Sequence, residues 1–411
     1  MNNSPVAHFG NRPETCIVHG LSNDPGGATL IYPDQPSFLA DGRQFVYNSA
    51  GGPMIGDVET LASRPVFGDG ARRHVHVSPD GRHVFWQERP GGSRDAIAIF
   101  RRAAEGGPVD EVFRADGRLP GSDVRVAAFN LHTVGPDNQR GAGQAWLGDG
   151  TQADAPIGVV SVDFARGTSC IAAAAPDFIN THLQYCRAAG PDAGRDLLVQ
   201  MNHGARTDAS GATTLPLGPP ADGGCDVHVV RDDGADWRDL PWGRDGRESC
   251  IGHQVWRGRT RQAATVTLQN QDKSYGWADG ARQEVVAGTP VPADPARPHR
   301  GRIGRGAHRI CLSRGFARPR FCHLCCDDSG LRFVCDTFPV FDGRRAGMRL
   351  YAGAAPDLHS PAAFRLLLNT CVTFNANNGY HAHPILSPDG RYILFNSDVT
   401  GQRQIYRVTA F

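Results

Sequence analysis

Two histidines stand one residue apart in the segment HAHPILSPDG, immediately before a Ser-Pro-Asp-Gly turn near the end of the sequence. The segment HVHVSPDG repeats the arrangement with His74 and His76. Because side chains alternate between the two faces of a β-strand, His381 and His383 share one face. Neutral imidazole is the commonest metal ligand in proteins, and several converging imidazoles suit manganese, iron, zinc or nickel. The spacing therefore favours metal binding.

The position four residues before the serine of such a turn is a histidine in several parts of the chain. With degenerate turns included, the position is filled by His74, His182, His253, His323 and His383. His132 fits the same register only approximately. A lone histidine at the start of a strand more often makes structural hydrogen bonds. With 16 histidines in 411 residues, however, five in one position are improbable by chance, and we expect these imidazoles to converge.

The turns belong to an internal repeat that is partly hidden by loops of unequal length. The segments SPDGRHVFWQ (78–87) and SPDGRYILFNS (387–397) are near copies, and LADGRQFVYNS (39–49) and DDSGLRFVCDT (327–337) are weaker ones. In each, a tight turn leads into a strand of apolar or alternating residues. Repeated antiparallel meanders of about 40–60 residues are typical of β-propeller blades. The sequence thus predicts an all-β fold, a seven-bladed β-propeller that closes as one ring and forms a single domain over residues 1–411.

The composition is that of a globular, turn-rich chain. Of 411 residues, 50 are glycine and 29 are proline, and the formal net charge is +1. Lys273 is the only lysine among 43 basic residues, and no basic stripe indicates a nucleic-acid partner. The first residues lack the pattern of an export signal, and no run of about 18 apolar residues predicts a membrane span. We expect a cytoplasmic protein that binds neither nucleic acid nor membrane.

The eleven cysteines are mostly scattered singly through the predicted strands, as expected for reduced thiols. The exception is the segment CHLCC, from Cys322 to Cys326. A zinc knuckle needs a second cysteine pair at a defined spacing, and Cys311 and Cys335 do not supply one. Buried free thiols are therefore favoured over a zinc site in this segment.

Several of these motifs resemble those of the oligogalacturonate lyases, seven-bladed β-propellers that act on pectin-derived oligouronides. The matching elements are H-x-H-P-x-x-S-P-D-G at residues 381–390, G-H-x-x-W at 252–256, H-x-C-x-x-D-x-G at 323–330, T-H-x-Q-Y at 181–185 and N-H-G at 202–204. The resemblance covers the chain from about residue 180 to the end, and the earlier blades match only in style. It implies a propeller with a carbohydrate-lyase site at the histidines.

The resemblance also implies a manganese ion held by three histidines and one glutamine, with another histidine at the catalytic centre. Matched position by position, His323, His381 and His383 are the metal histidines, and His253 is the catalytic base. Asn378 falls at the position of the glutamine, one methylene shorter, in N-x-x-H-x-H spacing. An amide oxygen beside imidazoles suits a borderline-hard ion such as Mn²⁺. The residues expected to contact an acidic oligosaccharide substrate are His74, His182, Gln184, Asn202, His203 and Arg206.

The match departs from the family at its catalytic arginine. The resemblance implies this arginine in the strand that follows N-H-G, where the alignment places Asp226 or His228. Arg231 and Arg206 are the nearby substitutes, and Arg231 is our candidate for the catalytic position. The departure favours a shift in substrate class, for example to another uronate-containing glycan.

We predict a metal-dependent lyase that cleaves short uronate oligosaccharides by β-elimination. In this reaction a base of near-neutral pKa removes the C5 proton while a metal ion neutralises the adjacent carboxylate. The sequence has neither a G-x-S-x-G elbow nor a G-x-x-x-x-G-K-[ST] phosphate loop, which argues against a serine hydrolase and a nucleotide-binding enzyme. Two alternatives stay open, namely a propeller lyase for a different uronate-containing glycan and a propeller that binds without catalysis.

Overall fold

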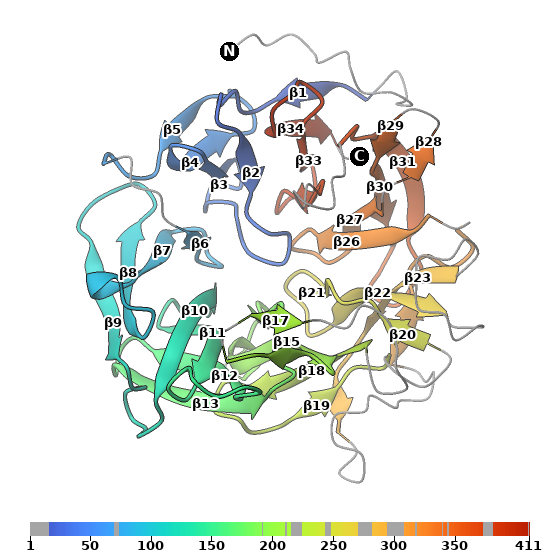
Figure 1. Ribbon diagram of the computed structural model, residues 1–411. Coiled ribbons are helices and arrows are strands. Elements are labelled where there is room, and N and C mark those ends of the chain that lie inside the picture. The colour runs from blue at the N-terminus through green and yellow to red at the C-terminus, as the bar shows by residue number, and fades with distance from the viewer. Residues whose placement is uncertain are drawn as a thin grey trace.

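The computed structural model is a ring of β-sheets around a central axis (Figure 1). It describes residues 16–69, 74–190, 192–209, 212–214, 224–242, 248–269, 282–293, 308–316, 319–338, 340–342, 345–372, 381–409 and 411. Every named element in these residues is a β-strand, apart from two 3-10 turns, η1 (Pro90–Gly92) and η2 (Ala193–Arg195). The predicted all-β class is confirmed.

Seven blades make up the ring, each an antiparallel sheet whose strands follow one another outward from the axis. Blade 1 contains β2 (Ala28–Leu30), β3 (Gln44–Ser49), β4 (Gly52–Asp57) and β5 (Ser63–Pro65). Blade 2 contains β6 (Val75–Val77), β7 (His83–Glu88), β8 (Ala96–Ala103) and β9 (Asp110–Asp116). Blade 3 contains β10 (Val126–Val134), β11 (Arg140–Leu147), β12 (Ile157–Asp163) and β13 (Thr168–Ala175).

The remaining blades carry most of the histidines singled out above. Blade 4 contains β14 (Gln184–Tyr185), β15 (Asp196–His203), β18 (Gly224–Arg231) and β19 (Arg238–Asp239). Blade 5 contains β20 (Glu248–Cys250), β21 (Val255–Trp256), β22 (Ala263–Gln269), β23 (Arg282–Gly288) and β25 (Arg309–Cys311). Blade 6 contains β26 (Phe321–Cys326), β27 (Arg332–Thr337), β30 (Arg349–Ala354) and β31 (Ala363–Asn369). Blade 7 contains β32 (Ile385–Leu386), β33 (Tyr392–Ser397), β34 (Gln404–Thr409) and β1 (Val18–Gly20).

Blade 7 closes the ring with strands from both ends of the described chain. β1 pairs antiparallel with β34, with Val18 opposite Val408 and Gly20 opposite Tyr406. Figure 1 shows β1 in blue beside β34 in red. Closing the ring in this way protects its blades from exposing long free edges. The predicted seven-bladed closed ring is confirmed.

Blades 4 and 5 are joined more closely than the other pairs. β20 pairs with β18 as well as β22, and β24 (Val291–Pro292) pairs with β19, so that ten strands form one continuous network. The shared hydrogen bonds fix the position of blade 5 relative to blade 4. The histidines that precede the inner strands of these two blades are thereby held in one frame.

The side chains of the Ser-Pro-Asp-Gly turns hydrogen-bond to the start of the strand that follows. The hydroxyl of Ser78 accepts a hydrogen bond from the His83 amide at 2.9 Å, and Ser387 accepts one from the Tyr392 amide at 2.9 Å. Gly81 has a φ of 70°, and a Cβ there would lie 2.3 Å from a backbone nitrogen of the neighbouring blade 1 turn. Glycine is required because it accepts both the left-handed conformation and the close approach.

The hydrophobic core consists of the faces that adjacent blades turn toward each other. Leu350 of blade 6 and Phe395 of blade 7 belong to one cluster, and Phe85 of blade 2 and Phe129 of blade 3 belong to another. Burial of such side chains is worth roughly 1.5–3 kcal/mol each relative to exposure. Packing between blades therefore sets the distances between residues that lie far apart in sequence.

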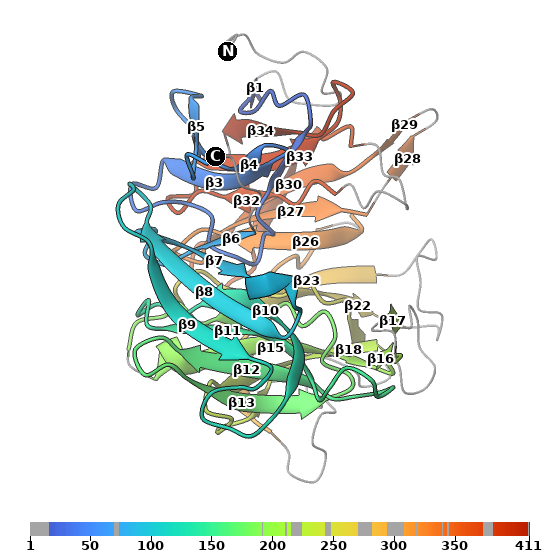
Figure 2. The ribbon, with the colours of Figure 1, turned by 60° about the vertical axis from the view of Figure 1, so that its left-hand side comes forward.

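Two hairpins project from the same side of the ring (Figure 2). They are β16 (Arg206–Thr207) with β17 (Thr213–Thr214), and β28 (Val340–Asp342) with β29 (Arg345–Gly347). Both arise from connections between the second and third strands of a blade, at the end where the first strand begins. His182, His253 and His383 precede the first strands of their blades, so the hairpins flank the histidine side. Among the described residues, no helix has the length and apolar character needed to cross a membrane.

Candidate metal centre and active site

Three of the histidines in the repeated position share an uncommon backbone conformation. His182, His253 and His383 have φ values of 45°, 57° and 43°. Positive φ costs free energy for residues other than glycine, and such residues gather at sites where the surrounding structure enforces a functional geometry. The repeat thus places these imidazoles in the same way in three blades, immediately before the innermost strand.

Four histidines of consecutive blades form an arc near the axis. The ring centroids of His182 and His253 lie 5.3 Å apart, those of His253 and His323 lie 4.3 Å apart, and those of His323 and His383 lie 4.4 Å apart. They come from blades 4, 5, 6 and 7, respectively. His74 precedes the inner strand of blade 2, where its side chain is exposed, and it is not part of this arc.

The three predicted metal histidines lie together. His323, His381 and His383 each offer a ring nitrogen, and these atoms all lie within 4.8 Å of one another. The His381 ring lies 5.1 Å from that of His323 and is stacked 5.2 Å from that of His383. Asn378, the predicted fourth ligand, lies outside the described residues.

A buried carboxylate holds the first of these imidazoles in place. Both Asp336 oxygens lie 3.0 Å from His323 Nδ1, and the carboxylate also accepts the backbone amides of His323 at 2.7 Å and His383 at 3.2 Å. Burial raises the pKa of Asp336 to about 7, against the opposing effect of these amide hydrogen bonds. A carboxylate on Nδ1 leaves Nε2 as the ligand atom, the arrangement common behind metal-binding histidines.

The protonation state of the cluster suits a metal ion. Burial lowers the pKa of His323 and His383 well below the ordinary value, and neighbouring histidines lower it further. Burial also lowers the pKa of His381, although Asp336 opposes the shift. Neutral imidazoles are the form that coordinates metals. Three neutral nitrogens with a carboxylate behind one of them fit a divalent transition metal.

A second group of possible ligands shares His323 with the first. His253, Cys322 and His323 also offer atoms within 4.8 Å of one another. Burial raises the pKa of the Cys322 thiol well above its usual value, whereas the thiolate is the metal-binding form. The group of three histidines is therefore the better metal site, and Cys322 is a buried thiol.

His253, the predicted base, lies beside the metal histidines without belonging to their group. Its ring is stacked on His323, with an angle of 29° between the planes. His253 Nδ1 lies 3.3 Å from the carbonyl oxygen of Cys322, so that Nδ1 is the donor and Nε2 can accept a proton. Burial is the main cause that lowers the pKa of His253 well below its usual value, and the neighbouring His323 lowers it further. The imidazole is therefore kept unprotonated.

The loop after β2 contributes two residues that the sequence did not identify. Asp34 Oδ2 lies 3.1 Å from His182 Nδ1, and the two side chains are only 6% and 7% exposed. His182 Nε2 is buried and has no hydrogen-bond partner among the described residues. The Tyr32 ring lies 4.9 Å from His383 and 5.1 Å from His182, and it also contacts His323. The segment IYPDQPS reads as an ordinary loop, so no local signal marks it.

The predicted substrate residues Asn202 and His203 lie at the end of β15, on the histidine side of the ring. His203 Nε2 lies 2.8 Å from Asp226, and its Nδ1 lies 3.4 Å from Asp177. The side chain of Gln200 donates to Asn202 Oδ1 at 2.8 Å. It also reaches Gly252, where a Cβ would lie 2.5 Å from Gln200 Oε1. Gln200 thus links the Asn202 region to the residue that precedes His253.

Among the described residues, the side chains of the candidate arginines contact carboxylates and no histidine. Arg231 ends β18 and contacts Asp192 at 3.7 Å and Asp233 at 3.5 Å. At about 3.3 Å per residue, Arg231 lies about 16 Å along the strand from Asp226. Arg206 is exposed beside Asp154, in the hairpin that flanks the histidine side.

Gln184, a predicted substrate residue, and His228, one of the two positions aligned with the family's arginine, both have structural hydrogen-bond partners. The Gln184 amide donates to the carbonyl oxygens of His182 at 3.1 Å and Gln254 at 2.7 Å, which ties blade 4 to blade 5. His228 is fully buried, with Nδ1 2.8 Å from Asp239. Gln184 therefore shapes the site through the backbone of His182.

Comparison with known proteins supports the fold. No protein-family model matches the sequence, and no curated protein matches it. An oligogalacturonate lyase in complex with manganese is similar in structure, with a TM-score of 0.67 and 16% identity over 98% of this chain and 95% of that one. The oligogalacturonate lyase of Vibrio parahaemolyticus gives a TM-score of 0.67 and 14% identity, over 97% and 95% of the two chains. The tricorn protease gives a TM-score of 0.51 and 11% identity, over 94% of this chain and 34% of its own.

These similarities, at such low identity, concern the fold, and they confirm the predicted resemblance at that level. The fold and the site together define a seven-bladed β-propeller with a histidine cluster at one end of its axis. In its overall structure the chain is similar to oligogalacturonate lyases.

Proposed function

We propose that this protein is a metal-dependent lyase that cleaves uronate-containing oligosaccharides by β-elimination. The observation that carries the proposal is the histidine triad oriented by Asp336, beside two further imidazoles that lie outside the triad. Elimination needs these parts: a cation for the carboxylate, a base for the C5 proton and an acid for the departing oxygen. The fold shared with oligogalacturonate lyases adds support.

The residues divide the reaction among them. A divalent cation, for example Mn²⁺, held by His323, His381 and His383 would supply a Lewis acid for the substrate carboxylate. His253 accepts the C5 proton at Nε2, since its Nδ1 faces the Cys322 carbonyl. His182 acts as an imidazolium: its Nδ1–H donates to Asp34, and its Nε2 proton passes to the C4 oxygen, which leaves the ring neutral. The C5–H and C4–O bonds break and a C4–C5 double bond forms, so neither water nor a redox partner is consumed.

The lyase proposal extends to uronates other than galacturonate. Asp226 lies at one of the two positions that the alignment gives for the family's catalytic arginine, and its carboxylate is paired with His203. A carboxylate there would repel the acidic substrate that an arginine would attract. This difference favours an altered substrate arrangement, and it also supports a second candidate function, a propeller that binds metal and acidic glycan without turnover.

The deciding experiment measures the ultraviolet absorbance of the unsaturated uronate product. The protein would be incubated with oligogalacturonate and with other uronate oligosaccharides, each with Mn²⁺ and with a chelator. Product that forms on one of these substrates and is lost with chelator is the expected result. Silence across the whole panel, with metal still bound to the protein, contradicts the lyase and supports the binding propeller.

A further inference from the structure

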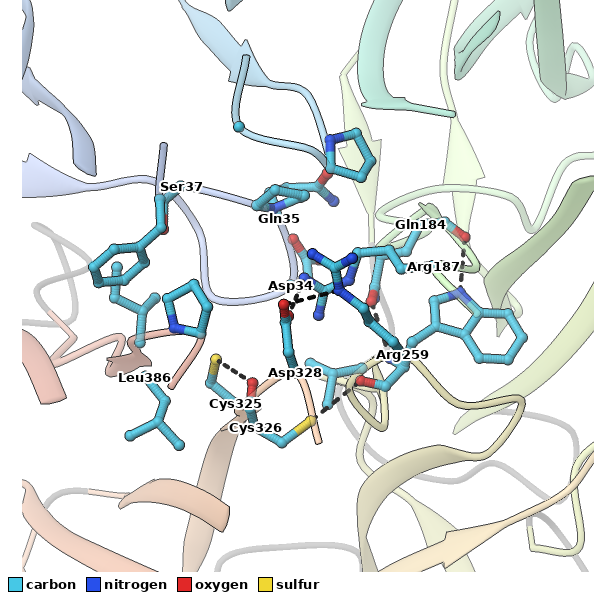
Figure 3. Close-up of a pocket in the computed structure, with 18 of the residues that line it drawn as sticks. Asp34, Gln35, Ser37, Gln184, Arg187, Arg259, Cys325, Cys326, Asp328 and Leu386 are labelled. Carbon is cyan, nitrogen blue, oxygen red and sulfur yellow. Dashed lines mark hydrogen bonds and ion pairs between the residues drawn. The ribbon is translucent and has the colours of Figure 1, made fainter. Parts of the chain in front are cut away.

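A hollow lies at the end of the inner strands where the Ser-Pro-Asp-Gly turns follow, and Figure 3 shows residues that line it. Its cavity volume is about 180 Å³, and part of its lining follows the histidines of blades 4 to 7. Gln184, Val255, Cys325 and Ile385 each come two residues after a histidine of the arc. Because a strand advances about 3.3 Å per residue, these residues lie about 6.6 Å further along the inner strands than the histidines.

The loop after β2 separates the hollow from the histidine cluster. Asp34 lines the hollow while its carboxylate contacts His182 on the other side. Gln35 also lines the hollow, and its amide donates to the carbonyl oxygen of Leu183 at 3.0 Å. Tyr32 from the same loop contacts the histidines and does not line the hollow. The two sites therefore share a wall formed by this loop.

Two arginines from neighbouring blades meet in the hollow. Arg187 follows β14 and Arg259 follows β21, and Figure 3 shows both side chains beside Asp328. Arg259 Nε lies 2.8 Å from one Asp328 oxygen, and Arg187 Nη1 lies 3.5 Å from the other. One carboxylate thus faces two guanidinium groups, which leaves a local excess of one positive charge.

Most hydrogen-bond donors of this pair remain unused. A guanidinium group has about five N–H donors, and each of the two side chains makes only its contact with Asp328 among the described residues. The side chain of Arg187 is only 24% exposed, whereas that of Arg259 is 57% exposed. The donors of Arg187 are mostly removed from water and lack acceptors, which is costly, and a bound anion would relieve that cost. Arginine forks match planar carboxylates in particular.

The remaining lining limits the charge of the anion. Asp34 and Asp80 add two carboxylates to that of Asp328. Asp34 is engaged by His182, and Asp80 accepts the Ser78 hydroxyl at 2.6 Å. Repulsion from these three carboxylates is about twice as large for a dianion such as hydrogen phosphate as for a monovalent carboxylate. Carboxylate, amide and hydroxyl groups on the wall can bind hydroxyl groups of a sugar.

We propose that this hollow is a second binding site, for a small polyhydroxylated monocarboxylate such as a single uronate sugar. The carboxylate binds between Arg187 and Arg259, and the sugar hydroxyls face Asp34, Gln35 and Ser37. This site goes beyond the proposed lyase function, because it uses none of the histidines and requires neither metal nor turnover.

The test is calorimetric titration of the full-length protein with galacturonate, with neutral galactose and inorganic phosphate as further probes. The double variant R187Q/R259Q is expected to bind galacturonate at least tenfold more weakly, and R259Q alone, at the more exposed side chain, to bind it several-fold more weakly. The matched control R391Q changes an exposed arginine outside the hollow and should bind as the native protein does. H381A, altered in the metal triad, should retain this binding event.

Three outcomes would overturn the proposal. Native-like binding in both R187Q/R259Q and R259Q would exclude the arginines, and loss of all galacturonate binding in H381A would place the ligand at the histidines. Phosphate or galactose binding as tightly as galacturonate would exclude a monocarboxylate site. If the double variant fails to fold, R259Q still decides the test, because Arg259 is a surface side chain whose replacement should not disturb folding. Since no cleavage is measured, failure of the lyase assay leaves this result unaffected.

Discussion

Asp336 contacts two of the proposed metal histidines at once, through the Nδ1 atom of His323 and the backbone amide of His383. The two histidines belong to adjacent blades, so one carboxylate sets the distance between ligands from different repeats. It is fully buried on β27, where any movement would disturb packing on both sides. The proposed metal site therefore includes a supporting residue that is not itself a proposed ligand.

The first prediction concerns this carboxylate. Asp336→Asn should weaken Mn²⁺ binding by about 10–100-fold, because the amide no longer fixes the His323 tautomer as the carboxylate does. Metal affinity would be measured by titration calorimetry, alongside the thermal unfolding midpoint. Asp357→Asn, at an exposed carboxyl, serves as the control. Unchanged Mn²⁺ affinity in Asp336→Asn would show that the carboxylate does not support the ligands.

The second prediction separates the base from the metal ligands. His253→Ala should abolish product formation and leave metal content unchanged, since His253 stands beside the triad and is not needed to complete it. His383→Ala should lower both, because it removes a ligand nitrogen. Product absorbance and bound metal would be measured on the same preparations. Turnover by His253→Ala would remove it from the role of base.

The third prediction concerns the dyad of His182 and Asp34. His182→Ala should lower kcat by about 10²–10⁴-fold, the usual contribution of a general acid. Asp34→Asn should lower kcat less and spare metal content, because it changes the hydrogen bond to Nδ1 and keeps the imidazole. His359→Ala, at an exposed histidine, is the control. If kcat were unchanged in His182→Ala, the leaving oxygen would obtain its proton elsewhere.

The fourth prediction is a loss of stability in acid. Burial lowers the pKa of His76 to about 3 and that of His132 to about 4, from an ordinary value of 6.5. Below pH 6.5 the unfolded chain therefore binds protons that the folded protein does not, so the free energy of unfolding should fall from pH 6.5 toward pH 4. His76→Gln should show a shallower fall in urea unfolding over this range, whereas His359→Gln should not. Equal slopes in all three proteins would contradict burial of a neutral His76.

The architecture was predictable because the same turn sequence recurs in several blades. Ser78 and Ser387 make the same hydrogen bonds in two blades, so near-identical sequences adopt near-identical local structures. The histidine position was predictable for the same reason, and four of its five members come together. Where the repeat signal is strong, local sequence therefore indicates tertiary position.

Residues outside the repeat could not be found in this way. Tyr32 and Asp34 reach the site only because the closed ring brings blade 1 across from blade 4. Asp336 lies on the strand next to His323, and its role depends on the pairing of β26 with β27, which includes a register shift. Arg231 lies five residues beyond Asp226 in the extended strand β18, so nearness in sequence does not mean nearness in space.

The last prediction concerns the glycine before the proposed base. Gly252 has a φ of 82°, and a Cβ there would lie 2.5 Å from Gln200 Oε1, so Gly252→Ala combines backbone strain with a clash. We expect a loss of about 1–3 kcal/mol in stability, together with lower activity from displacement of His253. Gly148→Ala is a matched control, because Gly148 also has a positive φ, 95°, with nothing within 4 Å of the added Cβ. Thermal unfolding and product absorbance of both variants would separate strain from clash. Equal effects of the two substitutions on activity would mean that contact with Gln200 does not position His253.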